Sequence, residues 1–253
     1  MNKNKINGAY KYRAINLDLI DSLVKRQIYF SPLAQLNDPF DCRVNVMESY
    51  SRALGCSGKD ERLRLEAIRR PLENFLVRYH EISLGFGIYS YSTTSLDPVM
   101  WSHYAAEHRG VCLAYEFPVS FQFDNRDITK PTVIEISPVN YTVNPLTAWI
   151  KSDALNVLNT NGVEGFELRL MSKLLTIKGE GWRYEKEARM ISHPAGFADI
   201  DPKSLKQVCF GLNASGKEID LVGALIDKCY RGVNKCKTVK SESMDFGLEV
   251  IDI

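Results

Sequence analysis

Several motifs that mark large protein classes are missing from this sequence. The six cysteines are scattered without a CxxC pair, and the four histidines lack HExxH spacing, so no zinc-binding pattern is complete. There is also no Walker-type glycine loop, no GxGxxG dinucleotide fingerprint and no GxSxG nucleophile elbow. On motif grounds these absences exclude structural zinc proteins, P-loop nucleotide hydrolases, Rossmann dehydrogenases and α/β-hydrolases. We expect no bound metal.

Long hydrophobic runs and a strong net charge are missing as well. No apolar stretch approaches the ~18 residues of a membrane-spanning helix, and no apolar run follows the basic N-terminus as in a secretory signal. The 32 Lys and Arg residues nearly balance the 31 Asp and Glu residues, which leaves a formal net charge of +1. We therefore expect a cytoplasmic protein without a membrane partner and without a global field that attracts polyanions.

The composition is that of a chain that buries a sizeable core. Hydrophobic residues make up 45% and charged residues 25% of the 253 residues. This length is close to the ~250 to 300 residues at which single cores stop growing. The sequence predicts one domain over residues 1–253, with a helical insertion at about 57–84 that Pro71 ends or kinks.

Strand-like and helical patterns follow one another without a strict strand–helix–strand repeat. Alternation typical of strands occurs at 9–15, 86–95 and 182–192. Helical spacing of apolar residues occurs at 59–84, 145–158 and 165–177. This mixture favours an α+β fold with mixed, mainly antiparallel β-sheets and flanking helices.

The segment WRYEKEAR carries the densest charge pattern. As a strand it places Glu185, Glu187 and Arg189 in a row on one face, with Trp182 and Tyr184 on the other. Neighbouring carboxylates raise one another's pKa, so such a row is unfavourable to bury unless a cation or a ligand hydroxyl offsets it. Two interpretations stay open: a solvated strand face with a surface ion pair, or a functional site.

A second informative segment is the helix in MWSHYAAEHRG. Asp97 precedes it as an N-cap, and Gly110 should end it. Trp101 and Tyr104 share an aromatic stripe with His103 beside it, a pattern typical of core residues and a satisfied polar neighbour. Aromatic side chains next to a polar site can also stack on a base or a nicotinamide ring.

The sequence NDPFD is a third candidate. Its Asn, Asp and Pro residues are typical of a turn. Asp38 and Asp41 are also of the type that binds Mg²⁺, although one loop alone offers few convergent oxygens.

Five motifs, in order, resemble a bacterial family known as domain of unknown function 2971. They are KYR near the start, FSPLAQLNDPFD, MWSHYAAEHRGVCL, WRYEKEAR and VCFG, which together span about 10–211. The resemblance implies a cytosolic bacterial protein. It also implies a role in phage defence, as a toxin or effector with an antitoxin or defence-system partner.

A looser resemblance is to ADP-ribosyltransferases of the toxin type, whose motifs run in the order arginine, Ser-Thr-Ser and Glu-x-Glu. Here Arg13, a Ser-Thr-Thr strand from Ser92 and the pair Glu185-x-Glu187 follow the same order, with Thr94 in place of the last serine. This resemblance implies a split β-sandwich fold and NAD as a substrate.

The same resemblance implies a role for each motif. Glu187 would stabilise the oxocarbenium-like ribose, and Glu185 would orient or deprotonate the acceptor, which is a protein, a nucleic acid, a small molecule or water. Arg13, helped by Lys11, would hold the pyrophosphate. The other candidate contacts to NAD are Asn37, Asp38, Ser92, Trp101, His103, Tyr104 and Arg189.

Two other functions fit the same segments. In a metal-dependent nuclease or phosphoesterase, divalent cations would bind Asp38, Asp41, Glu185 and Glu187. A non-enzymatic module that senses a nucleotide or a phage protein would bind its ligand without turnover.

Overall fold

The computed structural model describes residues 5–118, 129–141, 143, 145–156 and 162–253. Its strands are β1 (Lys5–Arg13), β2 (Gln27–Pro32), β3 (Gly87–Ser92), β4 (Val111–Pro118), β5 (Thr132–Pro138), β6 (Asn140–Tyr141), β7 (Ile177–Lys178), β8 (Glu187–His193), β9 (Gly196–Asp199), β10 (Leu205–Phe210), β11 (Asn234–Lys240) and β12 (Leu248–Asp252). Its α-helices are α1 (Leu17–Lys25), α2 (Val46–Gly55), α3 (Lys59–Leu84), α4 (Pro98–Tyr104), α5 (Pro145–Asn156), α6 (Gly162–Thr176) and α7 (Gly216–Cys229). Short 3-10 helices are η1 (Leu33–Gln35), η3 (Glu180–Glu185) and η4 (Pro202–Ser204).

The predicted α+β class with mainly antiparallel sheets is confirmed. Ten strands form one open sheet whose main path runs β12-β11-β10-β4-β1-β3-β2-β9, while β8 pairs with β3 and β5 pairs with β8. Only the β10–β11 pair in this sheet is parallel among the described strands, and α7 connects those two strands. The parallel pair β6–β7 forms a separate two-stranded sheet.

The large sheet branches at β3. One edge of β3 pairs along its whole length with β8. On the other edge, Gly87 and Ile88 pair with β2, whereas Ser92 pairs with Tyr10 of β1. Among the described strands, none pairs with residues 89–91 on that edge, because β1 and β2 have diverged. The strands therefore separate in the middle of the fold.

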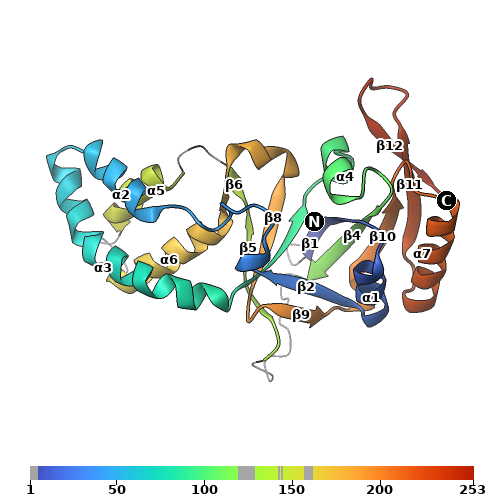
Figure 1. Cartoon of the computed structure of the whole chain (residues 1–253), viewed down its shortest axis with the longest axis horizontal. Coiled ribbons are helices and arrows are strands. Elements are labelled where there is room, and N and C mark those ends of the chain that lie inside the picture. Colours follow the sequence, from blue (N-terminus) through green and yellow to red (C-terminus); the bar gives the residue numbers. More distant parts are fainter. Residues whose placement is uncertain (1–4, 119–128, 142, 144, 157–161) are drawn as a thin grey trace.

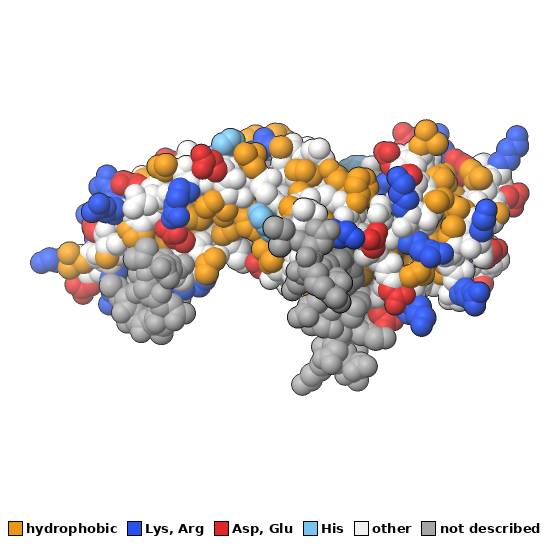
Figure 2. Space-filling model, turned by 90° about the horizontal axis from the view of Figure 1, so that it is seen from below, with side chains coloured by type: hydrophobic (Ala, Val, Ile, Leu, Met, Phe, Trp, Pro, Cys, Tyr) orange, Lys and Arg blue, Asp and Glu red, His pale blue; other side chains and the backbone are white. Residues whose placement is uncertain are grey.

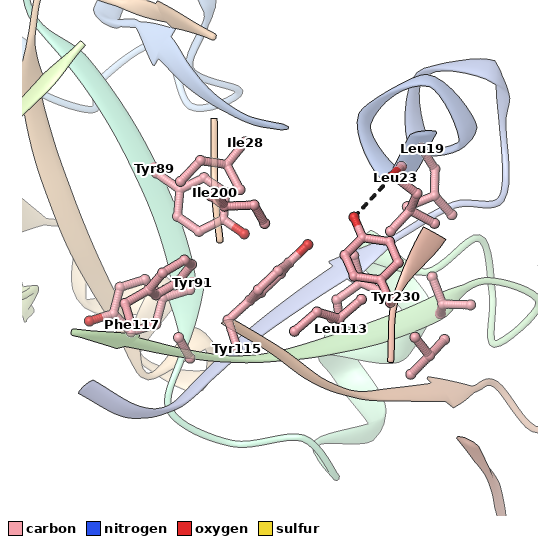
Figure 3. Close-up of a cluster of buried hydrophobic side chains, with 14 of the residues drawn as sticks. Leu19, Leu23, Ile28, Tyr89, Tyr91, Leu113, Tyr115, Phe117, Ile200 and Tyr230 are labelled. Atoms are coloured by element: carbon pink, nitrogen blue, oxygen red, sulfur yellow. Dashed lines mark hydrogen bonds between the residues drawn. The ribbon is translucent and has the colours of Figure 1, made fainter. Parts of the chain in front are cut away.

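Two large hydrophobic clusters lie in different parts of the molecule. The first joins the sheet to α1 and α7, where the Tyr230 hydroxyl donates to the Leu23 carbonyl over 2.9 Å (Figure 3). The second lies within the helices α2, α3, α5 and α6, which gather at one end of the chain's elongated shape (Figure 1). Its largest fully buried members include Tyr50, Ile68 and Phe166. The predicted insertion helix is thus one of four helices that share this core with Ile88 of β3 and Ile191 of β8.

Pro71 is predicted to end or kink the long helix, and it does not end it. α3 continues through it from Lys59 to Leu84. A proline leaves the carbonyl four residues earlier without its helical hydrogen bond. Here that carbonyl belongs to Ala67, which is an exposed residue. Buried Ile68 and Leu72 on either side of Pro71 hold the helix against its core.

Two other predicted boundaries differ from the structure. α4 ends at Tyr104 rather than at Gly110, and Ala106 and the two residues after it have positive φ angles of 49°, 55° and 66°. Gly110 instead enters β4 so tightly that a Cβ atom there would lie 2.2 Å from the Arg13 carbonyl oxygen. The helix predicted over 145–158 is described as far as Asn156, and Leu158 lies outside the described residues.

No helix in the described part of the chain combines the length and the apolar character needed to cross a membrane.

Replacing Trp101 with alanine should destabilise the protein by about 3–5 kcal/mol, the range for deleting a buried aromatic side chain. Trp101 is 0% exposed, meets Tyr12 edge to face at 5.3 Å, and donates from its indole nitrogen to the Ser95 carbonyl. Urea unfolding would measure the change. The control is Phe246→Ala at a 93% exposed position, where a change within about 0.5 kcal/mol is expected. Equal effects of the two substitutions would contradict this placement of Trp101.

Candidate functional site

A cavity of about 230 Å³ opens where β1 and β2 diverge from β3. Its charged and amide-bearing lining residues include Lys11, Asn37, Asp41, Lys178, Glu185 and Glu187. Its aromatic lining residues are Tyr10, Tyr12, Tyr91 and Tyr104. Strands β1, β2, β3, β7 and β8, helices α4 and η3, and the NDPFD loop all contribute to it. The branch of the sheet therefore brings together the three segments singled out from the sequence.

The ammonium of Lys178 lies among three buried carboxylates. Its Nζ is 2.6 Å from Oε2 of Glu185, 3.0 Å from Oε2 of Glu187 and 3.7 Å from Oδ2 of Asp41. All four side chains are at most 5% exposed. A buried charge is tolerated when opposite charges and hydrogen bonds surround it, and Lys178 supplies that compensation to each carboxylate.

Arg189 forms ion pairs with two of these carboxylates, Asp41 and Glu187, from the side on which the helices lie. Its Nε lies 2.7 Å from Oε1 of Glu187, and its Nη2 lies 2.6 Å from Oδ2 of Asp41. Its Nη1 donates to the Leu175 carbonyl of α6 over 2.8 Å. The guanidinium is 0% exposed, so it is a buried link between β8, the NDPFD loop and α6.

Tyr104 closes the outer side of this charge network. Its hydroxyl donates a short hydrogen bond to Oε1 of Glu185 and accepts one from Asn37 Nδ2 at 3.1 Å. Asn37 is exposed, Tyr104 is half-buried and Glu185 is buried, so these three residues lead from the surface to the network. The NDPFD loop is thus held at both ends, through Asn37 to Tyr104 and through Asp41 to Arg189.

The backbones of the two glutamates are also fixed. Ser92 Oγ donates to the Glu185 carbonyl over 2.7 Å and accepts from the Thr94 amide over 3.2 Å. The Glu187 amide donates to the Tyr141 hydroxyl over 2.7 Å. Ser92 therefore positions Glu185 from the end of β3.

The prediction of one continuous strand through WRYEKEAR is wrong at its first half. Trp182, Tyr184 and Glu185 belong to the 3-10 helix η3, and β8 begins only at Glu187. Between them Lys186 has a left-handed backbone with φ of 44°. Both glutamates nevertheless reach Lys178, because the turn at Lys186 redirects the chain between them. The surface ion-pair interpretation is also wrong, since these side chains are buried.

Six of the predicted site residues line the cavity: Lys11, Asn37, Ser92, Tyr104, Glu185 and Glu187. Lys11 extends from β1 toward β3, where its Nζ donates to the Ser90 carbonyl over 2.5 Å and lies 4.8 Å from the centre of the Tyr89 ring. It is the cation that β1 contributes to the cavity.

The other five predicted residues lie outside the lining. Arg189 lies behind Glu187, and Trp101 is buried in the core beside Tyr12. Asp38 accepts from the Phe40 amide within its own turn, as an Asx–Pro turn predicts. The last two are Arg13 and His103. Arg13 is the last residue of β1 and pairs with Val111 of β4. His103 is exposed, and its Nδ1 lies 3.0 Å from the Tyr184 hydroxyl.

Lys178 is the central residue that sequence reasoning missed. It follows the end of α6 after Leu174, Leu175, Thr176 and Ile177, all of which are buried. A lysine that ends an uninterrupted buried run is a weak signal of a buried cation, because most lysines at helix ends are exposed. Asp41, weighed in the sequence only as a metal ligand, is its partner and that of Arg189.

The surroundings shift the pKa values of the two glutamates in opposite directions. Burial raises the pKa of Glu185, and the nearby Lys178 ammonium only partly offsets this. Burial also tends to raise the pKa of Glu187. The charge and hydrogen bonds of Arg189, together with the charge of Lys178, outweigh burial and lower the pKa of Glu187 to about 2. Oppositely shifted neighbouring carboxyl groups are typical of sites that need one permanent charge and one proton-transfer group.

Burial, with the charge of Arg13, lowers the pKa of Lys11 to about 8. Burial also raises the pKa of Tyr104 far above its usual value, and its hydrogen bond to Glu185 adds to this. Tyr104 is therefore a neutral donor to Glu185 over the physiological range.

No group of three His, Cys, Asp or Glu side chains in the described residues is arranged to hold a metal ion. Among the three carboxylates the compensating charge is the Lys178 ammonium. On the face shown in Figure 2, basic and acidic side chains of the described residues are interspersed, in keeping with the formal net charge of +1.

Residues 100–190 match the model of a family described as a protein of unknown function (DUF2971). The match supports the resemblance to that family over this segment. It includes Tyr104, Lys178, Glu185, Glu187 and Arg189, but not the lining residues from β1 or the NDPFD loop. No curated protein and no solved structure matches the chain.

Arg189→Ala should lower the free energy of unfolding by about 3–5 kcal/mol, because it leaves Asp41 and Glu187 buried with half of their compensation removed. Chemical denaturation would measure the loss. Arg69→Ala is the matched control, because its ion pair with Glu73 on α3 is exposed and screened by solvent, and it should have little effect. A small effect of Arg189→Ala would show that the charges are not held as described.

Acid should remove the contribution of Glu187 to stability. Because its pKa in the folded protein, about 2, lies below the ordinary value of 4.5, the ionised group stabilises the fold above pH 4.5 and loses this effect as the pH falls toward 2. The difference in unfolding free energy between wild type and Glu187→Gln should therefore shrink over that range. A free-energy difference between the two proteins that stays constant from pH 4.5 to 2 would contradict the lowered pKa of Glu187.

Proposed function

We propose that the protein cleaves the bond between nicotinamide and ribose in NAD, as an ADP-ribosyltransferase-like enzyme or an NAD glycohydrolase. The observation that carries this proposal is the pair of buried glutamates with oppositely shifted pKa values on one cavity. A toxin or phage-defence role, with an antitoxin or defence-system partner, follows from the family resemblance and is part of the same proposal.

The chemistry requires a fixed negative charge. Cleavage of a glycosidic bond passes through an oxocarbenium-like state, which a nearby carboxylate stabilises. Glu187 is ionised throughout the physiological range, lines the cavity and is held at two atoms by Arg189. A carboxylate that does not have to reorient as the positive charge develops is suited to this role.

Glu185 is suited to proton transfer. A general base works best when its pKa approaches the working pH, and burial moves the pKa of Glu185 in that direction. Tyr104 and Lys178 each bind one of its carboxylate oxygens, so the group has a single orientation toward the cavity. Glu185 would take the proton of the nucleophile that attacks the ribose.

The arrangement of the strands also supports the proposal. The motifs that resemble toxin-type ADP-ribosyltransferases include Arg13 at the end of β1, Ser92 at the end of β3, and Glu185 and Glu187 at the end of η3 and the start of β8. Tyr10 of β1 pairs with Ser92 of β3, and Ser92 pairs with Glu187 of β8, so the three strands that carry these motifs are neighbours in the sheet. Arg13 does not line the cavity, so we assign the phosphate contact to Lys11.

The cavity sets which part of NAD enters. Its volume of about 230 Å³ is below the ~300 to 1,000 Å³ of sites that enclose drug-sized ligands. We place the nicotinamide and its ribose inside, with tyrosine rings as walls, and the adenosine outside. Trp101, predicted as a wall, lies in the core, and Tyr10, Tyr12 and Tyr104 take its place.

Glu187→Gln should abolish nicotinamide release from NAD, because it removes the charge that stabilises the oxocarbenium-like state. Chromatography of NAD incubated with purified protein would measure release. Glu180→Gln is the matched control: Glu180 lies in the same segment but pairs with exposed Arg183 and does not line the cavity, so activity should be kept. Release that persists in a folded Glu187→Gln protein would contradict the proposal, and NAD binding without turnover in wild type would indicate a sensor.

A further inference from the structure

We infer that water is the acceptor of the ADP-ribosyl group, so that the protein hydrolyses NAD and does not modify a macromolecule. The inference rests on the proposed function and concerns the same site. It follows from the depth of the two glutamates, the cover that Tyr104 forms and the charge around the reacting position.

The glutamates lie too deep for the side chain of another protein. Glu185 is 4% exposed and Glu187 is 5% exposed. A nucleophile that Glu185 activates must come within ~2.6–3.2 Å of its carboxylate. Nicotinamide and its ribose would take up most of a cavity of about 230 Å³, so a nucleophile that reaches Glu185 beside them must be small.

Tyr104 covers the approach to Glu185 from outside. Its hydroxyl binds Oε1 of Glu185, and exposed Asn37 binds that hydroxyl in turn. A bulky acceptor would have to displace the Tyr104 ring and break both hydrogen bonds. Water, as the smallest acceptor, requires the least displacement of the ring.

Electrostatics also disfavour a cationic acceptor. Lys11, Lys178 and Arg189 balance Asp41, Glu185 and Glu187, and the charge of Arg13 also acts on Lys11, so no excess negative charge remains to attract a guanidinium or an ammonium. Lys178 already binds both glutamates. Uncharged water meets no such barrier.

The reaction balances without any further reactant. The water oxygen bonds to the anomeric carbon of the nicotinamide ribose while the bond between that carbon and the nicotinamide nitrogen breaks. The electron pair of the broken bond stays on the nitrogen and neutralises the nicotinamide ring. Glu185 takes one proton from the water and later releases it to solvent. The products are nicotinamide, ADP-ribose and one proton.

The test follows NAD labelled in its adenine ring, incubated with the full-length protein and a bacterial lysate. We expect free ADP-ribose in an amount equal to the nicotinamide released, with no label in the protein or nucleic-acid fractions. Label in either fraction at the expense of free ADP-ribose would overturn this inference and leave the proposed function intact. Absence of nicotinamide release would overturn both.

A variant pair tests the cover directly, with agmatine as a small guanidine acceptor. Tyr104→Ala removes the ring and should raise the share of ADP-ribose transferred to agmatine, whereas Tyr104→Phe keeps the ring and should leave that share at the wild-type level, although its overall rate falls with the loss of the hydroxyl that orients Glu185. The readout is a product ratio, so a change in overall rate does not affect it. Transfer to agmatine by wild type would contradict the inference, and if Tyr104→Ala does not fold, the wild-type ratios decide.

Discussion

The ammonium of Lys178 among three carboxylates is the contact on which the candidate site depends. Asp41 lies in the NDPFD loop, whereas Glu185 and Glu187 lie at the end of η3 and the start of β8, and the three are buried together because Lys178 and Arg189 neutralise them. Removing one member of such a network leaves the others uncompensated in a region that excludes water. The positions of the NDPFD loop, η3 and the start of β8 are therefore coupled, and the site is preorganised before any ligand binds.

The branch of the sheet at β3 opens the cavity through which a ligand can reach this charge network. If β1 and β2 both paired along the whole of β3, the middle of that strand would be covered and the carboxylates would be closed off. Their divergence leaves Ser90 and Tyr91 lining the cavity, and Lys11 of β1 donates across the gap to the Ser90 carbonyl. Helix α6 supplies the Leu175 carbonyl that binds Arg189, so the helices and the large sheet together build one site.

Local patterns predicted local structure well. Alternation in FGIYSYS indicated β3, and Asp97 followed by proline marked the start of α4, because both depend on neighbouring residues alone. The left-handed turn at Lys186 had no such signal, since glycine or asparagine usually marks that conformation. The burial of Lys178 could not be predicted because it depends on the turn that brings Glu185 and Glu187 to it and on Asp41, which lies far away in the sequence. Long-range charge pairing, which decides the site, leaves little trace in a single sequence.

The most direct test of the account is a crystal structure of the Glu187→Gln protein with NAD. We expect the nicotinamide ribose in the cavity, with its anomeric carbon beside residue 187, a water between that carbon and Glu185, and the adenosine outside. NAD bound elsewhere, or an undisturbed empty cavity at saturating NAD, would contradict the claim that this charge network is an NAD-cleaving site.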